Sequence, residues 1–210
     1  MLRQASQYIH IAGYVLAGGA SSRFGPDKAL AVFAGQTLLQ RAVGLLDGVA
    51  DSVQVVAPDG RYPDLGEMAL PDRWPGEGPL GGILSALEAS RECGYRWNLI
   101  VSCDMPFLTS DWLGYMLERA VSGVADVLFP CSRTGVEPMC GCWRTAALPA
   151  LQDAFEEGVR KVTDAARRVA LEVLDETHWS QFDPGARIFW NMNTPQDYEA
   201  IVRISGRDKT

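Results

Sequence analysis

The chain has 210 residues, 47% of them hydrophobic, and its 19 Lys and Arg residues against 26 Asp and Glu residues give a formal net charge of −7. A surface that neutralises the phosphates of a duplex normally carries an excess of basic residues, so this acidic balance argues against a nucleic-acid partner. It leaves room for a small phosphorylated ligand, because the charges nearest a pocket set the potential there.

Short apolar runs that end at Gly, Pro or polar residues predict buried strands as far as residue 130. These runs are residues 13–16, 53–57, 68–70, 98–102 and 124–129. The segments between them have the apolar spacing of helices. One predicted helix begins at Thr37 and ends before Gly48, one begins at Pro79 and runs through Glu88, and one spans residues 110–121. Such alternation predicts βαβ units with right-handed crossovers.

Beyond Pro130 the pattern loosens, and the predicted elements are shorter. We predict strands at residues 137–143, 171–174 and 188–190, helices at 145–156 and 162–168, a last helix from Pro195, and a frayed tail at 205–210. Together the elements predict an α/β fold, with a doubly wound, mostly parallel sheet flanked by helices, in a single domain over residues 1–204.

No apolar run approaches the roughly 18 residues that a membrane helix requires, and the first residues lack a signal-peptide pattern. We therefore expect a cytoplasmic protein with no membrane partner. The five cysteines include no C-x-x-C pair, so we expect free thiols and neither a zinc nor a redox site. Cys140 and Cys142 alternate as residues on a strand do, which predicts that their sulfur atoms lie on the same face.

The loop after the first predicted strand, residues 16–28, combines glycines with two cations, Arg23 and Lys28. Glycines let consecutive backbone N–H groups point into one concavity that binds anions, and nearby cations strengthen it. The loop therefore suits a triphosphate; the alternative is a Gly-rich turn with two solvated cations. It is not a Walker A loop, because Pro26 stands where that motif has Lys, and it does not fit a dinucleotide-binding fingerprint.

Two further loops stand out, because ligands of an open parallel sheet bind at the carboxyl ends of its strands. Asp104 comes directly after the most apolar predicted strand, where it would suit Mg²⁺, a cation that takes one or two protein carboxylates and completes its shell with water and ligand oxygens. The alternative is that Asp104 caps the next helix, which Pro106 disfavours. Residues 70–82 are rich in Gly and Pro and suggest close approach of the backbone to something flat or bulky.

Five segments carry motifs that occur together, in this order, in one family. L-A-G-G-x-S-x-R-[MF]-G-x-D-K is met at residues 16–28, G-P-L-[AG]-G-I at 78–83 and C-D-x-P-[FY] at 103–107. Residues 137–139 resemble an E-P-L segment, and residues 191–195 match N-x-N-T-P. In these motifs the chain resembles the molybdenum cofactor guanylyltransferase family, bacterial enzymes of the nucleotide-diphospho-sugar transferase superfamily. Gly81 replaces the commoner Ala, which we expect to be neutral, and the family's Asn after the second strand has no counterpart at Ala57 and Pro58.

The resemblance implies a Rossmann-like nucleotidyltransferase fold and a Mg²⁺-dependent enzyme that transfers GMP from GTP to molybdenum-molybdopterin and releases pyrophosphate. The nucleotide-binding half would span about residues 9–130 and the acceptor-binding half about residues 131–204. The implied nucleotide contacts are Leu16, Ala17, Gly18, Gly19, Lys28, Asp72, Gly78 and Asp104. The implied catalytic residues are Arg23, Lys28 and Asp104, of which Asp104 would bind Mg²⁺. The implied acceptor contacts are Glu137, Asn191 and Asn193.

Attack by the terminal phosphate of molybdopterin on the α-phosphorus of GTP would need no general base, because a phosphate monoester with a second pKa near about 6 is largely dianionic at neutral pH. Catalysis would then rest on positioning and charge neutralisation, with Mg²⁺ on Asp104 and with Arg23 and Lys28 stabilising the departing pyrophosphate. We expect His10 and His178 to be surface or structural residues.

Two alternatives stay open. One is a transferase of the same fold that uses CTP or acts on another phosphorylated acceptor, although Gly18-Gly19 and residues 79–82 favour guanine over cytosine. The other is a molybdopterin-binding adaptor without activity, which the presence of Asp104 disfavours, because a structural paralogue has no need of a metal carboxylate.

The expected partners are GTP and molybdenum-molybdopterin, together with molybdoenzymes or their chaperones. Arg160 and Lys161 follow Gly158. They would either offer a basic edge to the pterin phosphate or form a solvated helix end.

Overall fold

The computed structural model describes residues 10–18 and 27–207. Within these residues the strands form one eight-stranded sheet in the order β10-β7-β9-β6-β1-β4-β5, with β8 paired to β7 alone. The strands of this sheet are β1 (Ile11–Leu16), β4 (Ser52–Ala57), β5 (Ala69–Pro71), β6 (Trp97–Ser102), β7 (Val127–Ser132), β8 (Gly135–Val136), β9 (Cys140–Arg144) and β10 (Leu171–Leu174). A separate antiparallel hairpin joins β2 (Val32–Phe33) and β3 (Gln36–Thr37).

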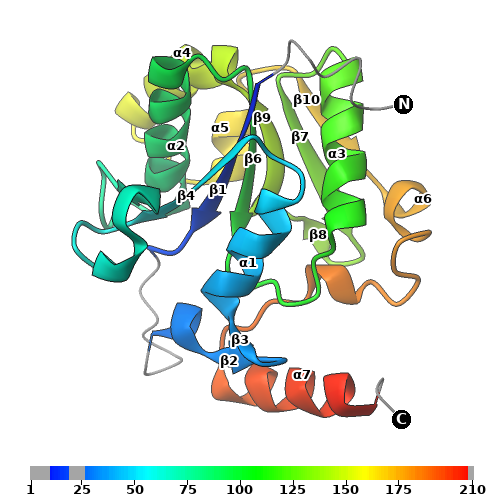
Figure 1. Ribbon diagram of the computed structural model, residues 1–210. Coiled ribbons are helices and arrows are strands. Elements are labelled where there is room, and N and C mark those ends of the chain that lie inside the picture. The colour runs from blue at the N-terminus through cyan, green and yellow to red at the C-terminus, as the bar shows by residue number, and fades with distance from the viewer. Residues whose placement is uncertain (1–9, 19–26, 208–210) are drawn as a thin grey trace.

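Helices cover both faces of the sheet (Figure 1). The helices α1 (Leu38–Asp47) and α3 (Ser110–Ser122) pack on one face. The other face is covered by α2 (Pro79–Cys93), α4 (Leu148–Glu156) and α5 (Val162–Ala166). The remaining helical segments are α6 (Glu176–Trp179), α7 (Pro195–Arg207) and the 3-10 helices η3 (Lys28–Leu30), η4 (Pro63–Met68), η5 (Thr145–Ala147) and η6 (Arg187–Phe189). The predicted doubly wound α/β fold is confirmed.

Local sequence explains where these helices begin and end. Thr37 and Gln40 form a capping box at the start of α1, in which each side chain accepts a hydrogen bond from the other residue's backbone amide. Thr109 accepts a hydrogen bond from the amide of Trp112 at the start of α3. Gly94 ends α2 in the left-handed conformation, with φ 78°. The helices predicted over the first half of the chain therefore appear where the sequence places them.

Each face of the sheet has its own hydrophobic core. Cys140 and Cys142 both pack into the core on the α1 and α3 face, as their alternation predicts. Burial raises the pKa of the Cys140 thiol to about 12, so this group stays neutral. Trp112, Trp143 and Trp179 are among the largest fully buried side chains.

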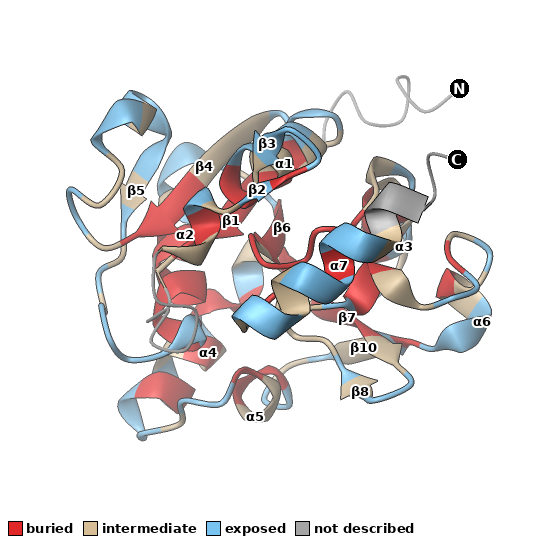
Figure 2. Cartoon of the chain, turned by 90° about the horizontal axis from the view of Figure 1, so that it is seen from below, coloured by how far each residue is buried: buried red, intermediate tan, exposed pale blue. Residues whose placement is uncertain are grey.

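Within the described residues, four strand pairs of the eight-stranded sheet are parallel and three are antiparallel: β9 runs antiparallel to both of its neighbours, β6 and β7, and β8 runs antiparallel to β7. The register aligns the strand ends, because Leu16 lies opposite both Val56 and Ser102, and Val56 lies opposite Leu70. The carboxyl ends of β1, β4, β5 and β6 therefore form one edge of the sheet. Figure 2 looks at the molecule from this side, with α7 nearest the viewer.

The predicted strand at residues 188–190 is wrong, because this segment is the 3-10 helix η6. The Asp183 carboxylate accepts hydrogen bonds from the amides of Gly185 at 3.0 Å and Ile188 at 2.9 Å, and Ala186 takes φ 57°. The Asp183 side chain thus satisfies backbone amides. In a strand, such amides would bond to a neighbouring strand. Ile188 and Phe189 are buried, so the apolar run indicates burial and not strand structure.

Several predicted boundaries shift. The strand β7 begins at Val127, and Val124, which was predicted to open it, is 92% exposed. The strand β9 begins at Cys140, whose amide donates to the carbonyl of Glu137 in a turn. The helix α7 runs to Arg207, so the start of the predicted tail at 205–210 is helical. The β2–β3 hairpin was not predicted. None of the helices in residues 10–18 and 27–207 combines the length and the apolar character needed to cross a membrane.

Candidate active site

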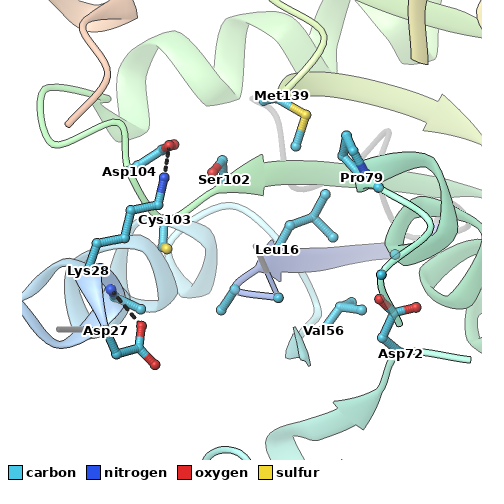
Figure 3. Close-up of a pocket in the computed structure, with 16 residues that line it drawn as sticks. Leu16, Asp27, Lys28, Val56, Asp72, Pro79, Ser102, Cys103, Asp104 and Met139 are labelled. Carbon is cyan, nitrogen blue, oxygen red and sulfur yellow. Dashed lines mark hydrogen bonds and ion pairs between the residues drawn. The ribbon is translucent and has the colours of Figure 1, made fainter. Parts of the chain in front are cut away.

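A cavity of about 480 Å³ opens at the edge where β1, β4 and β6 end. Its walls come from the strand ends, from η3 and from the start of α2 (Figure 3). The residues that line it are Leu16, Ala17, Gly18, Asp27, Lys28, Ala29, Val56, Asp72, Gly76, Gly78, Pro79, Gly82, Ser102, Cys103, Asp104 and Met139. Every described residue that was predicted to contact the nucleotide is in this lining, whereas Gly19 and Arg23 lie outside the described residues.

Lys28 and Asp104 form an ion pair at one end of the cavity (Figure 3). The Lys28 Nζ atom lies 2.6 Å from Asp104 Oδ2 and 2.9 Å from Asn193 Oδ1. The backbone carbonyl of Asp104 also accepts a hydrogen bond of 2.8 Å from the amide of Met192. The segment that contains Asn193 is therefore joined to the loop after β6 both by the shared ammonium group and through its backbone.

The second carboxylate oxygen of Asp104, Oδ1, is buried and receives no hydrogen bond from any described residue. A buried carboxylate oxygen without a partner is costly, so its environment suits a cation. The described residues include no group of three or more His, Cys, Asp and Glu side chains that would by itself hold a metal ion. A single carboxylate at the mouth of a ligand cavity fits Mg²⁺, which draws its remaining ligands from water and from a bound phosphate.

Asp72 stands across the cavity from Asp104 (Figure 3). Its Oδ1 atom accepts a hydrogen bond from the amide of Trp74 at 2.9 Å and lies 3.2 Å from the Ser85 hydroxyl. Its own amide donates to the carbonyl of Ala57 at 2.8 Å. These contacts fix the carboxylate at the rim, at the end of the cavity away from the Lys28 ammonium group.

The Gly- and Pro-rich loop forms the wall next to Asp72. Gly78 takes φ 83° immediately before Pro79 opens α2, and both residues line the cavity. A β-carbon on Gly81 would lie 2.9 Å from the β-carbon of Trp74 and 3.0 Å from its carbonyl oxygen. An alanine at this position would therefore require Trp74 to shift, whereas the expectation that Gly81 in place of the commoner Ala leaves the chemistry unaltered stays a prediction.

Arg160 supports the same loop from outside. Its Nε atom donates to the Glu77 carboxylate at 2.5 Å, and its guanidinium lies 3.9 Å from the centre of the Phe155 ring. The side chain is thus committed to Glu77, in the loop that precedes α2. Lys161 is exposed at the start of α5.

The three predicted acceptor residues are not gathered together. None of the three is in the cavity lining, although the Asn193 side chain reaches Lys28. The Glu137 carboxylate accepts a hydrogen bond from the Ser132 hydroxyl at 2.7 Å, and the Asn191 side-chain amide donates to the carbonyl of Phe189 at 3.1 Å. Both side chains are used to hold their own turns.

Some cavity residues were not assigned a role from the sequence. Cys103 lies next to Asp104, where burial and then the Asp104 charge raise the pKa of its thiol to about 12, so it is not a thiolate nucleophile. Asp27 belongs to the first motif, but its partners are Arg61 and Tyr62, which lie far along the chain after β4. The motif therefore includes Asp27, but only the folded structure shows that its partners are Arg61 and Tyr62.

Burial opposes the charge of Asp27. Hydrogen bonds from Arg61, from Tyr62 and from the amide of Ala29 outweigh this effect and hold the pKa of the carboxyl below its ordinary value of 3.8. The group is therefore a carboxylate near neutral pH. Its ion-pair partner is Arg61, whose Nε atom lies 3.0 Å from Asp27 Oδ2.

Comparison with known proteins identifies the relatives of this chain. Residues 13–171 match the family model described as the MobA-like NTP transferase domain. The chain is 36% identical over 197 residues to a protein of Deinococcus radiodurans named as a probable molybdenum cofactor guanylyltransferase, and the match covers 92% of this chain and 93% of that relative.

Two solved structures share the fold. Molybdopterin-guanine dinucleotide biosynthesis protein A from Archaeoglobus fulgidus superposes with a TM-score of 0.79 at 22% identity, covering 93% of this chain and 99% of its own. The 2-C-methyl-D-erythritol 4-phosphate cytidylyltransferase of Thermus thermophilus gives a TM-score of 0.68 at 17% identity, covering 94% and 100%. At these identities the likeness concerns the fold, which serves more than one nucleotide base.

Proposed function

The chain belongs to the family of MobA-like NTP transferase domains, and from this premise we propose that it transfers GMP from GTP to molybdenum-molybdopterin. The products are the molybdopterin guanine dinucleotide cofactor and pyrophosphate. One observation carries the proposal: Lys28 and Asp104 form an ion pair in the cavity at the strand ends, and the Lys28 ammonium group also contacts Asn193, a side chain of the expected acceptor segment that lies beside the cavity. Nucleotide and acceptor would therefore meet at the same charged group.

The phosphates of GTP lie at the Lys28 end of the cavity in this proposal. The Lys28 ammonium group neutralises phosphate charge and keeps it neutralised as pyrophosphate departs, together with Arg23 of the same motif. Ala17 and Gly18 bring backbone close to the ligand, and the start of α2 at Gly78 and Pro79 lines the opposite wall. Positioning and charge compensation are the main contributions that such a site makes to phosphoryl-group chemistry.

Asp104 is the residue that would hold Mg²⁺, and its unpartnered Oδ1 atom supports this role. When bound, the ion supplies charge neutralisation at phosphate oxygens and orients them. The acceptor phosphate is the nucleophile, and with a second pKa near about 6 it is already largely dianionic at neutral pH. Asp104 and Lys28 therefore need not remove a proton, and the neutral Cys103 thiol beside them takes no part in proton transfer.

Asp72 would read the base or the ribose at the far end of the cavity. A guanine edge presents N–H donors that a carboxylate accepts. Because Trp74 and Ser85 already hold the Oδ1 atom of Asp72, the carboxylate is oriented before the ligand binds. Such preorganisation lowers the cost of recognising the nucleotide.

The test is pyrophosphate release by the purified protein with GTP, CTP, ATP or UTP, with and without molybdopterin and with and without Mg²⁺. The proposal expects release that requires molybdopterin and Mg²⁺ and is fastest with GTP. A fastest rate with CTP would replace the proposal with a cytidylyltransferase. Binding of molybdopterin without release from any nucleotide would indicate an adaptor.

A further inference from the structure

One hydroxyl group lies between the two described ends of the first motif. The Tyr62 Oη atom is 2.8 Å from Asp27 Oδ2 and 3.3 Å from the backbone carbonyl oxygen of Ala17. Ala17 follows β1 directly, and Asp27 directly precedes Lys28, the first residue of η3. Both residues line the cavity, whereas Tyr62 approaches them from the connector after β4.

Asp27 in turn fixes the backbone at Lys28, the first residue of η3. Its Oδ1 atom accepts a hydrogen bond of 3.1 Å from the amide of Ala29, and its carbonyl accepts one of 3.0 Å from the amide of Leu30, so Asp27 caps η3. Lys28 is therefore held between a capped backbone on one side and its ion pair with Asp104 on the other. If the Asp27 side chain rotated, the cap would loosen. The backbone that carries the Lys28 side chain would then be held less firmly.

Ala17 is fixed independently of the tyrosine. Its amide donates to the carbonyl of Val56 at 2.9 Å, which continues the pairing of β1 with β4. Tyr62 itself is partly buried and packs against the core on the α1 and α3 face. Core packing thus holds the Tyr62 ring, and strand pairing holds the backbone of Ala17. The group that the Tyr62 hydroxyl positions is therefore the Asp27 carboxylate.

The charges of this cluster favour a neutral phenol that donates to a carboxylate. Burial and the Asp27 carboxylate raise the pKa of Tyr62 well above its ordinary value, so the hydroxyl keeps its proton. Arg61 donates its Nε–H to the same Oδ2 atom at 3.0 Å. A hydrogen bond to a charged acceptor is stronger than one between neutral groups.

We propose that Tyr62 is a positioning residue for nucleotide binding: its hydroxyl holds Asp27 beside Ala17 and thereby places Lys28 for the phosphates of GTP. The inference rests on the proposed function, since it specifies how the nucleotide end of that site is kept in shape. Tyr62 is not in the cavity lining, and it acts through Asp27.

The test compares Tyr62→Phe with Tyr14→Phe. The control removes a comparable hydroxyl, because Tyr14 Oη lies 2.7 Å from Ser90 Oγ in the buried interior and Tyr14 is not in the cavity lining. We expect Tyr62→Phe to raise the KM for GTP and the dissociation constant of Mg²⁺-GTP about tenfold, and to raise the KM for molybdopterin by less, because the Lys28 ammonium group also contacts Asn193. Tyr14→Phe leaves both constants within about twofold.

A second readout requires no nucleotide. Amide hydrogen exchange in the free protein should be faster at Ala29 and Leu30 in Tyr62→Phe than in the wild type, and unchanged there in Tyr14→Phe, with global melting temperatures measured alongside. Exchange and GTP affinity that match the wild type in Tyr62→Phe would overturn the proposal. So would an equal loss of affinity in Tyr14→Phe.

The double variant Tyr62→Phe/Asp27→Ala tests whether Tyr62 acts through Asp27. If Tyr62 acts through Asp27, the double variant binds GTP no more weakly than Asp27→Ala alone, whereas additive losses would show that Tyr62 works by another route and overturn the proposal. A wild-type protein that fails to bind Mg²⁺-GTP would contradict the proposed function itself. A wild type that binds normally while Tyr62→Phe binds equally well contradicts only the role of Tyr62.

Discussion

The candidate site has two kinds of wall, and only the first of them lines the cavity. The nucleotide wall is built from the ends of β1, β4 and β6 and from the start of α2, and sheet hydrogen bonds fix its register. The acceptor wall is the segment around residues 190–193, which we assign to the acceptor; it follows η6, pairs with no strand of the described residues and lies beside the cavity, where Asn193 contacts Lys28. It is attached through the Met192 side chain, which is buried in a hydrophobic cluster with Phe33 and Leu38, and through two polar contacts, the Met192 amide to the Asp104 carbonyl and Lys28 to Asn193.

This difference indicates which part of the site is already formed before the substrates bind. Backbone pairing determines the nucleotide wall, so its residues keep their places when one side chain is changed. The acceptor wall is held by the buried Met192 side chain and by individual polar contacts, one of which uses the ammonium group that also pairs with Asp104. A nucleotide phosphate that draws Lys28 toward itself would also alter what Asn193 contacts, so we expect the two substrates to influence each other at this residue.

We expect the largest effect on activity from substitutions of Asp104. Both Asp104→Ala and Asp104→Asn should lower kcat/KM by about 100-fold or more, because neither keeps the carboxylate charge that a metal ion requires. The fold should remain intact, since sheet pairing and not this side chain holds the loop. Steady-state pyrophosphate release and a thermal melt would measure the two effects, with Glu118→Ala on the exposed face of α3 as the control. A near-normal rate in Asp104→Asn would exclude the metal role.

Lys28 tests the connection between the walls. We expect Lys28→Ala to raise the KM for GTP by about 10- to 100-fold and to raise the KM for molybdopterin as well, because the ammonium group contacts both Asp104 and Asn193. Lys28→Arg should recover part of the loss, since it keeps the charge but changes its shape. An effect confined to one substrate would show that the group serves only one wall.

Asn193 tests the acceptor wall by itself. Asn193→Ala should raise the KM for molybdopterin by about five- to tenfold and leave the KM for GTP within about twofold, because one neutral hydrogen-bonding group is removed. Asn191→Ala is the matched comparison, and its effect should be smaller, since its amide is already bonded to the carbonyl of Phe189. The opposite ranking, measured by varying each substrate in turn, would mean that Asn191 turns toward the acceptor when it binds.

The smallest expected effect concerns pH and the Asp27 cap. The pKa of Asp27 is lower in the folded protein than its ordinary 3.8, so its contribution to stability is present above that pH and is lost as the pH falls through the folded value. We expect the unfolding free energies of wild type and Asp27→Asn to differ by about 1 kcal/mol or less near pH 6, and the difference to shrink below about pH 4. Denaturant unfolding at several pH values measures this difference, and a gap that widens in acid would contradict the assigned sign.

The sequence predicts the nucleotide wall well, because its signals are local. Apolar runs locate β1, β4 and β6, and Asp104 directly after β6 must lie at the carboxyl edge of a parallel sheet. The motif that ends in Lys28 also places that cation at the same edge, where the structure finds the ion pair with Asp104.

The acceptor wall was harder to predict, since its structure depends on contacts between distant residues. The apolar residues Ile188 and Phe189 are buried whether the segment is a strand or a helix, and only the Asp183 turn distinguishes η6 from a strand. The contact between Tyr62 and Asp27 likewise joins segments 35 positions apart in the chain. Nothing in the sequence near Gly81 shows that Trp74 fills the space of an alanine side chain.

The most direct test of the account is a competition experiment. The protein is incubated with molybdenum-molybdopterin, Mg²⁺ and equimolar GTP and CTP, and the dinucleotide products are identified by mass. The account predicts that the guanine dinucleotide predominates and that Asp104→Asn yields neither product at a comparable rate. A predominant cytosine dinucleotide, or guanine dinucleotide formed at an undiminished rate by Asp104→Asn, would contradict it.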